Sequence, residues 1–569
     1  MSIRARFLLV IGLLAILFAT VAAKLVEIQV IEHGRWLQAA NQFQVRELLQ
    51  SHPRGRIYDR NGLLLAFDVR ATSIALDNLH MTRPELMESL LKRYVKLSQQ
   101  RARQLIYRKA YFTWIARKMD TGTAQALERE SQAQDIRGLI FVPEWKRVYP
   151  QGSLASSVIG FAGIDNQGLE GVELSFDEVL RGREEKHEVV LGGGGITLAD
   201  RILEPGSPGA DLYLTLDGRI QHLAEEAIRE GVQRYHAKGG FVVVLDPQTG
   251  EIVAMAQNKT YDLNDFEHSS TQEHKNVAVS QLFEPGSSFK VFPMLAALET
   301  GVIDLRERFD GNEPVVIASH AFHNSENKNY GPITPAEILK DSVNTAMIRV
   351  AQKLGEEALY GFLKRLHFGE KTEVRLPGEE SGVLPRLEDW SALEIGSIAI
   401  GQSVSMTGVQ LASRYAALAN GGWLRPLEIA KRIVLPPGGR VAEQAVITSA
   451  AAPRGERIAS SENLQALLDM MKLVVEEGTG ILAQIDGFEI AAKSGTGQKA
   501  IPGQGYVPGK YTSLFAGLFP ASDPQYVILV VLDEVGTKLY YGGQTAAPIF
   551  RELAEGIIEQ KHLLPTRGK

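Results

Sequence analysis

The strongest constraint on this chain is an uncharged apolar run near its N-terminus. Arg4 and Arg6 precede this run, which extends from Phe7 to Ala23, and two further apolar residues follow Lys24. At 1.5 Å per residue, a helix of about 17–20 residues just spans the hydrocarbon core of a bilayer. The rest of the sequence contains no second apolar run of that length. The sequence therefore predicts a single membrane crossing at most.

Two interpretations of this run are open. A cleaved signal peptide has a basic start, an apolar stretch and small residues such as Ala22 and Ala23. An uncleaved anchor has a longer apolar run, as this chain does. In both cases the basic residues favour a cytoplasmic N-terminus and export of the remaining chain.

Length, charge and cysteine content narrow the class of protein. A chain of 569 residues is too long for one hydrophobic core and predicts two to four domains. The net charge of -6 argues against a general nucleic-acid binder, so no nucleic-acid partner is expected. Because the chain has no cysteine, disulfides, thiolate catalysis and Cys-ligated zinc are excluded.

The first part of the chain mixes short strands and helices. The turn-forming residues Asp59–Gly62 separate Ile57–Tyr58 from Leu63–Ala66 and predict a β-hairpin. Residues 83–135 are rich in Leu, Arg, Gln and Glu and are predicted to be helical. The best candidates for an interdomain hinge are two glycine-rich stretches, Gly192–Gly195 and Pro205–Gly209.

A second module begins near Asp211. Asp217 is predicted to cap a helix with one apolar face, and a helix from about Ala547 to Gln560 closes the chain. Apolar runs predict strands at both ends of the module: Phe241–Leu245, Glu251–Gln257, Ser513–Phe519 and Tyr526–Asp533. This order predicts an α+β domain whose antiparallel sheet is built from both ends of the segment.

The pattern Ser-x-x-Lys occurs three times, at Ser89–Lys92, Ser287–Lys290 and Ser325–Lys328. Only Ser287 follows a Pro-Gly turn and precedes an apolar helical run. A serine at a helix N-terminus lies beside free backbone N–H groups, and a lysine three positions later lies on the same face. The other two occurrences are interpreted as exposed side chains that match by accident.

Ser287 and Lys290 suit nucleophilic catalysis. A serine hydroxyl needs a base, and a lysine is a base only when it is neutral. The pKa of Lys290 would have to fall by about three units from about 10.4, at a cost of ~4–5 kcal/mol. Desolvation and a nearby second cation both lower a lysine pKa.

The pattern Ser-x-Asn also occurs three times, at Ser325–Asn327, Ser342–Asn344 and Ser461–Asn463. We favour Ser342 and Asn344, because a predicted helix precedes them and another follows. A loop between two helices can direct a hydroxyl and an amide into a cleft. A helix N-cap is an equally good interpretation of the local sequence.

Lys493-Ser494-Gly495-Thr496 follows the apolar stretch Phe488–Ala492. This pattern predicts a strand that ends at a glycine, where the backbone of a ligand could approach closely. Lys493 offers a cation, and Ser494 and Thr496 offer hydroxyl donors. Taken alone, the pattern is that of an ordinary polar strand end.

The order of these patterns identifies a family. Ser-x-x-Lys, Ser-x-Asn and Lys-Ser-Gly follow one another at positions 287, 342 and 493, which is the signature of serine penicillin-recognising enzymes. The chain resembles the class B penicillin-binding proteins, the monofunctional peptidoglycan transpeptidases. Further segments carry the resemblance along nearly the whole chain: Arg54–Gly62, Gly168–Glu173, Glu284–Lys290, Gly401–Thr407 and Gly478–Gly480.

The resemblance implies a domain order and a location. Residues 1–6 would be a cytoplasmic tail, 7–26 a transmembrane anchor, 27–210 a pedestal module of the dimerisation type, and 211–569 the transpeptidase domain. The protein would cross the bacterial inner membrane once, with the catalytic domain on the periplasmic side. An uncleaved anchor is thereby favoured over a signal peptide.

The resemblance also implies roles for the matching residues. Ser287 would be acylated by the penultimate D-Ala of a stem peptide, and by β-lactams, with Lys290 as its base. Ser342 and Asn344 would relay protons and hold the peptide. The segment Lys493–Thr496, with Ser494 and Gly495 inside it, would bind the terminal carboxylate. The backbone N–H groups of Ser287 and Thr496 would form the oxyanion hole, and no cofactor is implied.

Subtype, partners and rival functions stay open at this point. Tyr540–Gly543 and Ala546–Pro548 favour a division-type enzyme over an elongation-type enzyme. Either type implies a glycosyltransferase of the SEDS class as partner, and the division type implies other division proteins. Rival functions are a serine β-lactamase, a non-catalytic β-lactam sensor or scaffold, and a metal site. The histidines considered for a metal are His320 and His323 with His268 or His274.

Overall fold

The computed structural model describes residues 2–36, 45–110, 112–191, 197–436, 457–501 and 505–566. The glycine run 192–195, predicted as a hinge, lies outside the described residues. The chain divides into two compact units. The first consists of Met1–Pro53 and Gly182–Gly209, and the second consists of Arg54–Arg181 and Ala210–Lys569.

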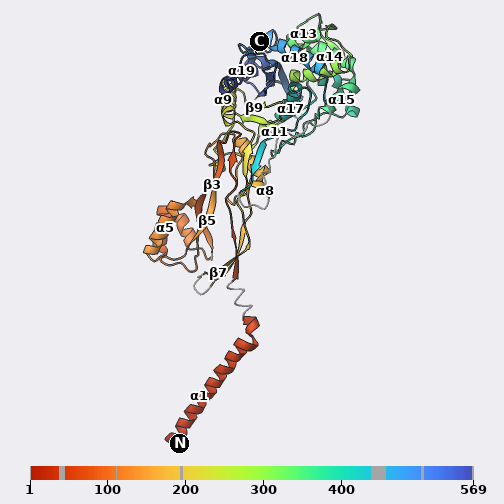
Figure 1. Cartoon of the computed structure of the whole chain (residues 1–569). Coiled ribbons are helices and arrows are strands. Elements are labelled where there is room, and N and C mark those ends of the chain that lie inside the picture. The colour runs from red at the N-terminus through yellow and green to blue at the C-terminus, as the bar shows by residue number, and fades with distance from the viewer. Residues whose placement is uncertain are drawn as a thin grey trace. The chain divides into compact units, whose positions relative to one another are not determined.

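The first unit contains the apolar helix. Helix α1 (Ile3–Val26) continues as a short π-helix (Glu27–Ile31) and covers the predicted anchor (Figure 1). Among the described residues it is the one helix long and apolar enough to cross a membrane. The same unit holds an antiparallel three-stranded sheet in the order β1-β6-β7. Its strands are β1 (Val45–Gln50), β6 (Glu185–Leu191) and β7 (Thr197–Glu204).

The predicted hairpin at the start of the second unit is confirmed. Strand β2 (Ile57–Tyr58) pairs antiparallel with β3 (Leu64–Leu76). The carboxylate of Asp59 closes the turn, because its Oδ1 accepts from the backbone N–H groups of Asn61 at 2.8 Å and Leu63 at 2.7 Å. An aspartate that bonds backbone two residues further on is a standard turn former.

The prediction that residues 83–135 are helical is right for three segments and wrong for one. Helices α3 (Pro84–Tyr94), α4 (Gln99–Ile106) and α5 (Thr121–Ala133) form, but residues 113–120 are strand β4. Strand β4 pairs with β3, as does β5 (Leu139–Val148). Arg117 on β4 is ion-paired with Glu144 on β5 at 2.6 Å. The cross-strand partners therefore stabilise a segment whose local composition favours helix.

A buried ion network holds this N-terminal region together. The Arg54 Nε atom donates to Glu173 Oε2 at 2.8 Å, and Arg147 Nε donates to Glu173 Oε1 at 2.7 Å. Arg147 also pairs with Asp68 at 3.1 Å, and Arg54 pairs with Asp177. Breaking such a network leaves a buried charge without compensation, which costs about 3–5 kcal/mol. The network ties β3 and β5 to the short helices α7 (Gly171–Ser175) and α8 (Asp177–Leu180), which follow the short helix α6 (Ser156–Ile159) in the chain.

One sheet runs across the predicted boundary at residue 210. Strand β8 (Asp211–Leu214) pairs in parallel with β2 and antiparallel with β15 (Ala430–Val434). The sheet order is β15-β8-β2-β3-β4. Strands from both sides of residue 210 thus share backbone hydrogen bonds, and a domain boundary there remains a proposal.

The central sheet of the second unit has the order β10-β9-β18-β17-β16 and is antiparallel throughout. Its strands come from both ends of the segment, as predicted: β9 (Gly239–Leu245), β10 (Ile252–Gln257), β16 (Ala491–Ile501), β17 (Gly505–Phe519) and β18 (Tyr526–Asp533). Helix α9 (Gly218–Arg234) is capped by Asp217 as predicted. Helix α19 (Gly542–Lys561) begins earlier than Ala547.

Helices cover both faces of this sheet (Figure 1). Helices α9 and α19 share one hydrophobic core with the sheet, and α17 (Gly408–Ala419) and α12 (Val291–Glu299) share the other. The remaining described α-helices of the middle segment are α10 (Thr271–His274), α11 (Val277–Ser280), α13 (Pro335–Lys340), α14 (Asn344–Leu354), α15 (Glu356–Arg365), α16 (Glu394–Ala399) and α18 (Ser461–Glu476). Four short strands complete it: β11 (Phe309–Asp310), β12 (Val315–Ile317), β13 (His320–Phe322) and β14 (Pro332–Ile333).

Candidate active site

Ser287 lies half-buried in a tight turn at the start of α12. Residues Gly286–Lys290 form a 3-10 helix that leads directly into α12, where an α-helical start was predicted. Gly286 has φ +54°, and a Cβ there would lie 2.6 Å from the carbonyl oxygen of Thr496. A glycine is therefore required for the turn to pack this closely against β16. The turn places Ser287 beside the edge strand.

Lys290 is fully buried behind the turn, among oxygen acceptors. Its Nζ donates to Ser342 O at 2.6 Å, to Asn344 Oδ1 at 2.7 Å and to Ser342 Oγ at 3.3 Å. The amine of Lys290 therefore contacts both the serine and the asparagine of the Ser-x-Asn motif at 342–344. The structure thus brings together the two motifs that sequence order had linked.

Ser342 lies in the short connection between α13 and α14, and Asn344 lies at the start of α14. Ser342 has φ +59°, which is rare for a non-glycine residue and turns its hydroxyl toward the two lysines. Asn344 is the first residue of α14, and its Nδ2 donates to His323 O at 2.9 Å. The amide of Asn344 is therefore held at one end by the backbone and offers its oxygen to Lys290.

Lys493 is fully buried on β16, on the other side of Ser342. Its Nζ donates to Ser342 Oγ at 3.0 Å and to Ser494 O at 3.1 Å. The hydroxyl of Ser342 consequently bridges the amines of Lys290 and Lys493. Such a bridge can pass a proton between the two amines.

Burial lowers the pKa of both lysines. Burial, with the charge of Lys493 as a second cause, lowers the pKa of Lys290 well below 10.5. Burial lowers the pKa of Lys493 to about 7. Each unit of displacement corresponds to about 1.4 kcal/mol in favour of the neutral amine. Burial therefore favours the neutral amine of Lys290, which is the form that can act as a base.

Strand β16 does not end at Gly495, so the predicted strand end is wrong. The strand continues to Ile501, and a Cβ on Gly495 would lie 2.6 Å from the carbonyl oxygen of Pro285. The close approach is made by the chain's own nucleophile turn instead of a ligand. The hydroxyls on either side have partners: Ser494 Oγ lies 2.9 Å from Thr479 Oγ1, and Thr496 Oγ1 accepts from Gly542 N at 3.0 Å.

These residues line a cavity of about 620 Å³. Ser287, Ser342, Asn344, Ser494 and Thr496 all contribute to its wall, whereas both lysines lie behind it. Sequence reasoning missed an aromatic side of this wall, formed by Tyr330, Tyr511, Tyr540 and Tyr541. The rings of Tyr511 and Tyr540 stack with centroids 4.4 Å apart. The Tyr-Tyr-Gly-Gly sequence was the available signal, but it was used only to assign a subtype.

The two other Ser-x-x-Lys matches are not built for catalysis. Ser89 lies within α3, in the N-terminal region. Ser325 lies at the rim of the cavity, but the Nζ of its lysine, Lys328, lies 4.8 Å from the ring centroid of Tyr330. A lysine held over an aromatic face is stabilised as a cation, which is the wrong form for a base.

The histidines considered for a metal have other partners. The Nδ1 atom of His323 lies 3.4 Å from Glu313 Oε2, and that of His268 lies 2.6 Å from Asp265 Oδ1. The Nε2 atom of His274 lies 2.7 Å from Ser269 Oγ. The ring of His320 packs against Phe322. Across the ranges that the structure describes, no three His, Cys, Asp or Glu residues converge as a metal site would require.

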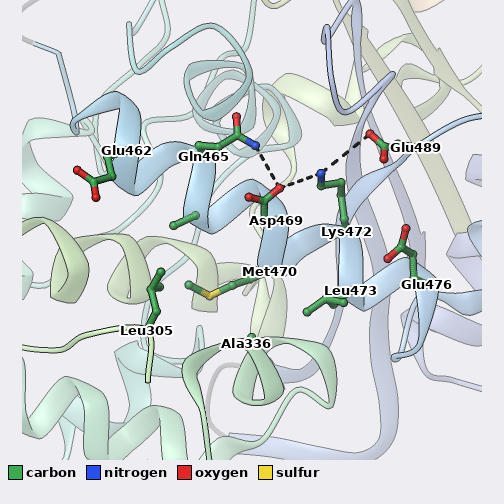
Figure 2. Close-up of a pocket in the computed structure, with 11 residues that line it drawn as sticks. Leu305, Ala336, Glu462, Gln465, Asp469, Met470, Lys472, Leu473, Glu476 and Glu489 are labelled. Carbon is green, nitrogen blue, oxygen red and sulfur yellow. Dashed lines mark hydrogen bonds and ion pairs between the residues drawn. The ribbon is translucent and has the colours of Figure 1, made fainter. Parts of the chain in front are cut away.

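A second hollow of about 690 Å³ lies along α18, over Leu305 and Ala336 (Figure 2). It shares no lining residue with the catalytic cavity. Its one lysine, Lys472, is ion-paired with Asp469 at 2.8 Å and with Glu489 at 4.0 Å (Figure 2). Carboxylate neighbours raise the pKa of Lys472, so this hollow offers no neutral base.

The two lysines predict a bell-shaped pH dependence for the second-order rate of acylation by a penicillin. As pH falls, Lys290 gains a proton and ceases to be a base; as pH rises through about 7, Lys493 loses the charge that attracts a carboxylate. We expect the alkaline limb near pH 7, from Lys493, and an acid limb where Lys290 gains its proton. Stopped-flow labelling between pH 5 and 9 measures both. In Lys493→Arg the alkaline limb should disappear, because a guanidinium stays charged. A flat profile for the wild-type protein would contradict the roles assigned to the two lysines.

Comparisons with known proteins give matches over most of the chain. A family model of the penicillin binding protein transpeptidase domain matches residues 240–555, and one of the penicillin-binding protein dimerisation domain matches residues 50–214. A probable peptidoglycan D,D-transpeptidase PenA of Neisseria gonorrhoeae is 31% identical, across 100% of this chain and 94% of its own. The peptidoglycan D,D-transpeptidase FtsI of Escherichia coli is 29% identical, across 98% of this chain and 92% of its own length. The crystal structure of penicillin binding protein 3 from Mycobacterium tuberculosis, complexed with aztreonam, superposes with a TM-score of 0.70 at 28% identity, across 91% of this chain and 98% of that one.

Proposed function

The chain belongs to the class B penicillin-binding proteins, with a dimerisation module before a transpeptidase domain, and on that premise we propose that Ser287 is its acylated nucleophile. The protein is a serine-type D-Ala-D-Ala transpeptidase that cross-links peptidoglycan stem peptides and is a target of β-lactams. The observation that carries the assignment of residues is the bridge from Lys290 through Ser342 Oγ to Lys493, directly behind the turn of Ser287.

The first half-reaction forms an acyl-enzyme. Ser287 Oγ attacks the carbonyl carbon of the penultimate D-Ala while its proton passes to neutral Lys290. The backbone N–H groups of Ser287 and Thr496 stabilise the oxyanion, a contribution worth ~3–4 kcal/mol. When the tetrahedral intermediate collapses, the C–N bond breaks, and the proton reaches the leaving D-Ala amine through the Ser342 hydroxyl. Asn344 holds Lys290 in place during both transfers.

The second half-reaction reverses these roles with a different amine. The acceptor amine of a neighbouring stem peptide attacks the ester carbonyl and gives its proton to the Lys290–Ser342 pair. Ser287 Oγ leaves and recovers a proton from the same pair, so the new amide forms without a cofactor. Proton transfer of this kind contributes about 10²–10⁴-fold to a rate.

Recognition of the donor peptide is assigned to the segment around Gly495. Lys493 supplies positive charge, and the hydroxyls of Ser494 and Thr496 donate to the terminal carboxylate. A bound carboxylate would raise the pKa of Lys493 from about 7, because an opposite charge favours the ammonium form. Substrate binding would therefore restore the charge that burial weakens.

The relatives and helix α1 support a proposal for the cellular role. Helix α1 serves as the membrane anchor, with Arg4 on the cytoplasmic side and the catalytic domain outside. Similarity to FtsI of Escherichia coli and to the stage V sporulation protein D of Bacillus subtilis supports a septal enzyme over an elongation enzyme. A SEDS-type glycosyltransferase and division proteins are its expected partners. Depletion in the source cell tests this: filaments without septa support the septal role, and rounded cells favour elongation.

Covalent labelling tests the enzymatic function. The full-length protein in detergent is incubated with a fluorescent penicillin, excess label is removed, and the bound label is followed over time. A label that persists for many minutes supports the transpeptidase. Release within seconds would indicate a β-lactamase, and no label at all would indicate a non-catalytic scaffold. Transfer of an acyl group from a stem-peptide donor to an added amine completes the test.

A further inference from the structure

Asn324 has a side chain with every hydrogen-bonding position occupied. The residue is 5% exposed and lies beside the catalytic cavity. Its Oδ1 accepts from the backbone N–H of Thr345 and from Thr345 Oγ1, both at 3.1 Å. Its Nδ2 donates to Gly311 O at 2.9 Å and to Lys328 O at 2.8 Å. A primary amide can make two bonds at each end, so no capacity is left unused.

The bonds to Thr345 replace a missing helix cap. The N-cap residue of α14 is Val343, which has no side-chain acceptor for the free N–H groups of the first turn. Asn324 supplies that acceptor from a loop that lies 21 residues earlier in the chain. The position of the first turn of α14 therefore depends on this loop.

The same loop also holds the neighbouring catalytic residue. His323 O accepts from Asn344 Nδ2 at 2.9 Å, while Asn344 Oδ1 accepts from Lys290 Nζ at 2.7 Å. Two consecutive loop residues, His323 and Asn324, thus fix two consecutive helix residues, Asn344 and Thr345. We propose that Asn324 is a positioning residue for acylation, which places Asn344 against Lys290 by fixing the start of α14. This inference rests on the proposed role of Ser287 and Lys290.

The two ends of the amide can be tested separately. Asn324→Ala removes the acceptor for Thr345 and both donors. Asn324→Asp keeps an acceptor at the N-terminus of α14, where a negative charge is favourable, but loses the donors to Gly311 and Lys328. If the cap is what matters for acylation, the aspartate variant should retain the reaction and the alanine variant should not.

The experiment measures two constants for the full-length protein in detergent. Stopped-flow labelling with a fluorescent penicillin gives the non-covalent dissociation constant and the first-order acylation rate constant. For Asn324→Ala we expect the rate constant to fall about 100-fold, since small misplacements of catalytic groups cost that much, with the dissociation constant within about 3-fold of wild type. For Asn324→Asp we expect the rate constant to stay within about 5-fold of wild type.

Ser460→Ala is the matched control. Ser460 caps α18, where its Oγ accepts from the N–H of Asn463, and it does not line the catalytic cavity. Its loss should lower the melting temperature as a lost cap does, without changing the acylation rate constant.

Several results would overturn the inference. The first is an acylation rate constant in Asn324→Ala that is close to wild type. The second is an equal loss of that rate constant in Asn324→Ala and Ser460→Ala. The third is a rise of the dissociation constant in Asn324→Ala that matches the fall of its rate constant. If Asn324→Ala does not fold, a folded Asn324→Asp that acylates about 100-fold more slowly would overturn it as well. Failure of the wild-type protein to label would instead refute the proposed function, so the two failures are distinguishable.

Discussion

Ser287→Ala should lose covalent penicillin labelling by at least about 10⁴-fold and keep its fold. The substitution removes the oxygen proposed to attack the carbonyl carbon, and alanine offers no nucleophile in its place. The removed atom lies on a half-buried side chain, so the free energy of unfolding should change by less than about 1 kcal/mol. Labelling on a denaturing gel and a thermal melt measure the two effects.

Ser288→Ala is the control for this prediction. Ser288 is adjacent in sequence but buried, and its Oγ donates to Pro285 O at 2.8 Å, which stabilises the turn. We expect this variant to melt earlier, because it loses a buried hydrogen bond, and still to be labelled. If Ser287→Ala were labelled at the wild-type rate, the nucleophile would be another residue, and Ser325 at the cavity rim would be the first to examine.

Lys290→Met should slow acylation by about 10²–10⁴-fold with little change in non-covalent penicillin binding. Methionine has a similar length and no basic nitrogen, so the proton of Ser287 loses its acceptor. Lys493, Ser494 and Thr496 remain to hold the carboxylate, so the dissociation constant should be nearly unchanged. Rapid mixing with a fluorescent penicillin separates the two constants.

Lys290→Arg distinguishes a base from a structural cation. A guanidinium keeps the charge and can donate to Ser342 and Asn344, but it does not give up its proton in a protein. We expect it to be as slow as Lys290→Met, with a melt in parallel to confirm folding. Recovery of the wild-type rate in Lys290→Arg would show that charge alone is required and would refute the general-base role.

Local sequence was sufficient for elements with a strong local signal, such as a turn-forming aspartate, a helix cap or a continuous apolar run. The hairpin closed by Asp59, the helix capped by Asp217 and the apolar strand Tyr526–Asp533 are all as predicted. It failed where distant partners decide the outcome. Strand β4 forms because β3 lies beside it, and β8 is a short strand whose two neighbours come from residues 57–58 and 430–434.

The same distinction between local signals and distant contacts applies to the residues of the active site. Ser287, Lys290, Ser342 and Lys493 could be named because their motifs occur in a fixed order, and the structure brings them together. Asn324 could not be named, because its role depends on the carbonyl groups of Gly311 and Lys328 and on the start of α14. No periodicity or spacing in the sequence records such contacts between a loop and a helix.

The order of the central sheet also has a consequence for biosynthesis. Strand β9 lies between β10 and β18, and Leu245 pairs with Val527, which the ribosome adds 282 residues later. At about 5–20 residues per second, roughly 15–60 s pass between the synthesis of these two strands. During that interval an apolar strand has one edge without its final partner, which is a condition that favours misfolding and aggregation. The nascent chain is therefore expected to need a chaperone until β18 emerges, and an N-terminal fragment that stops before residue 526 should not form the catalytic sheet.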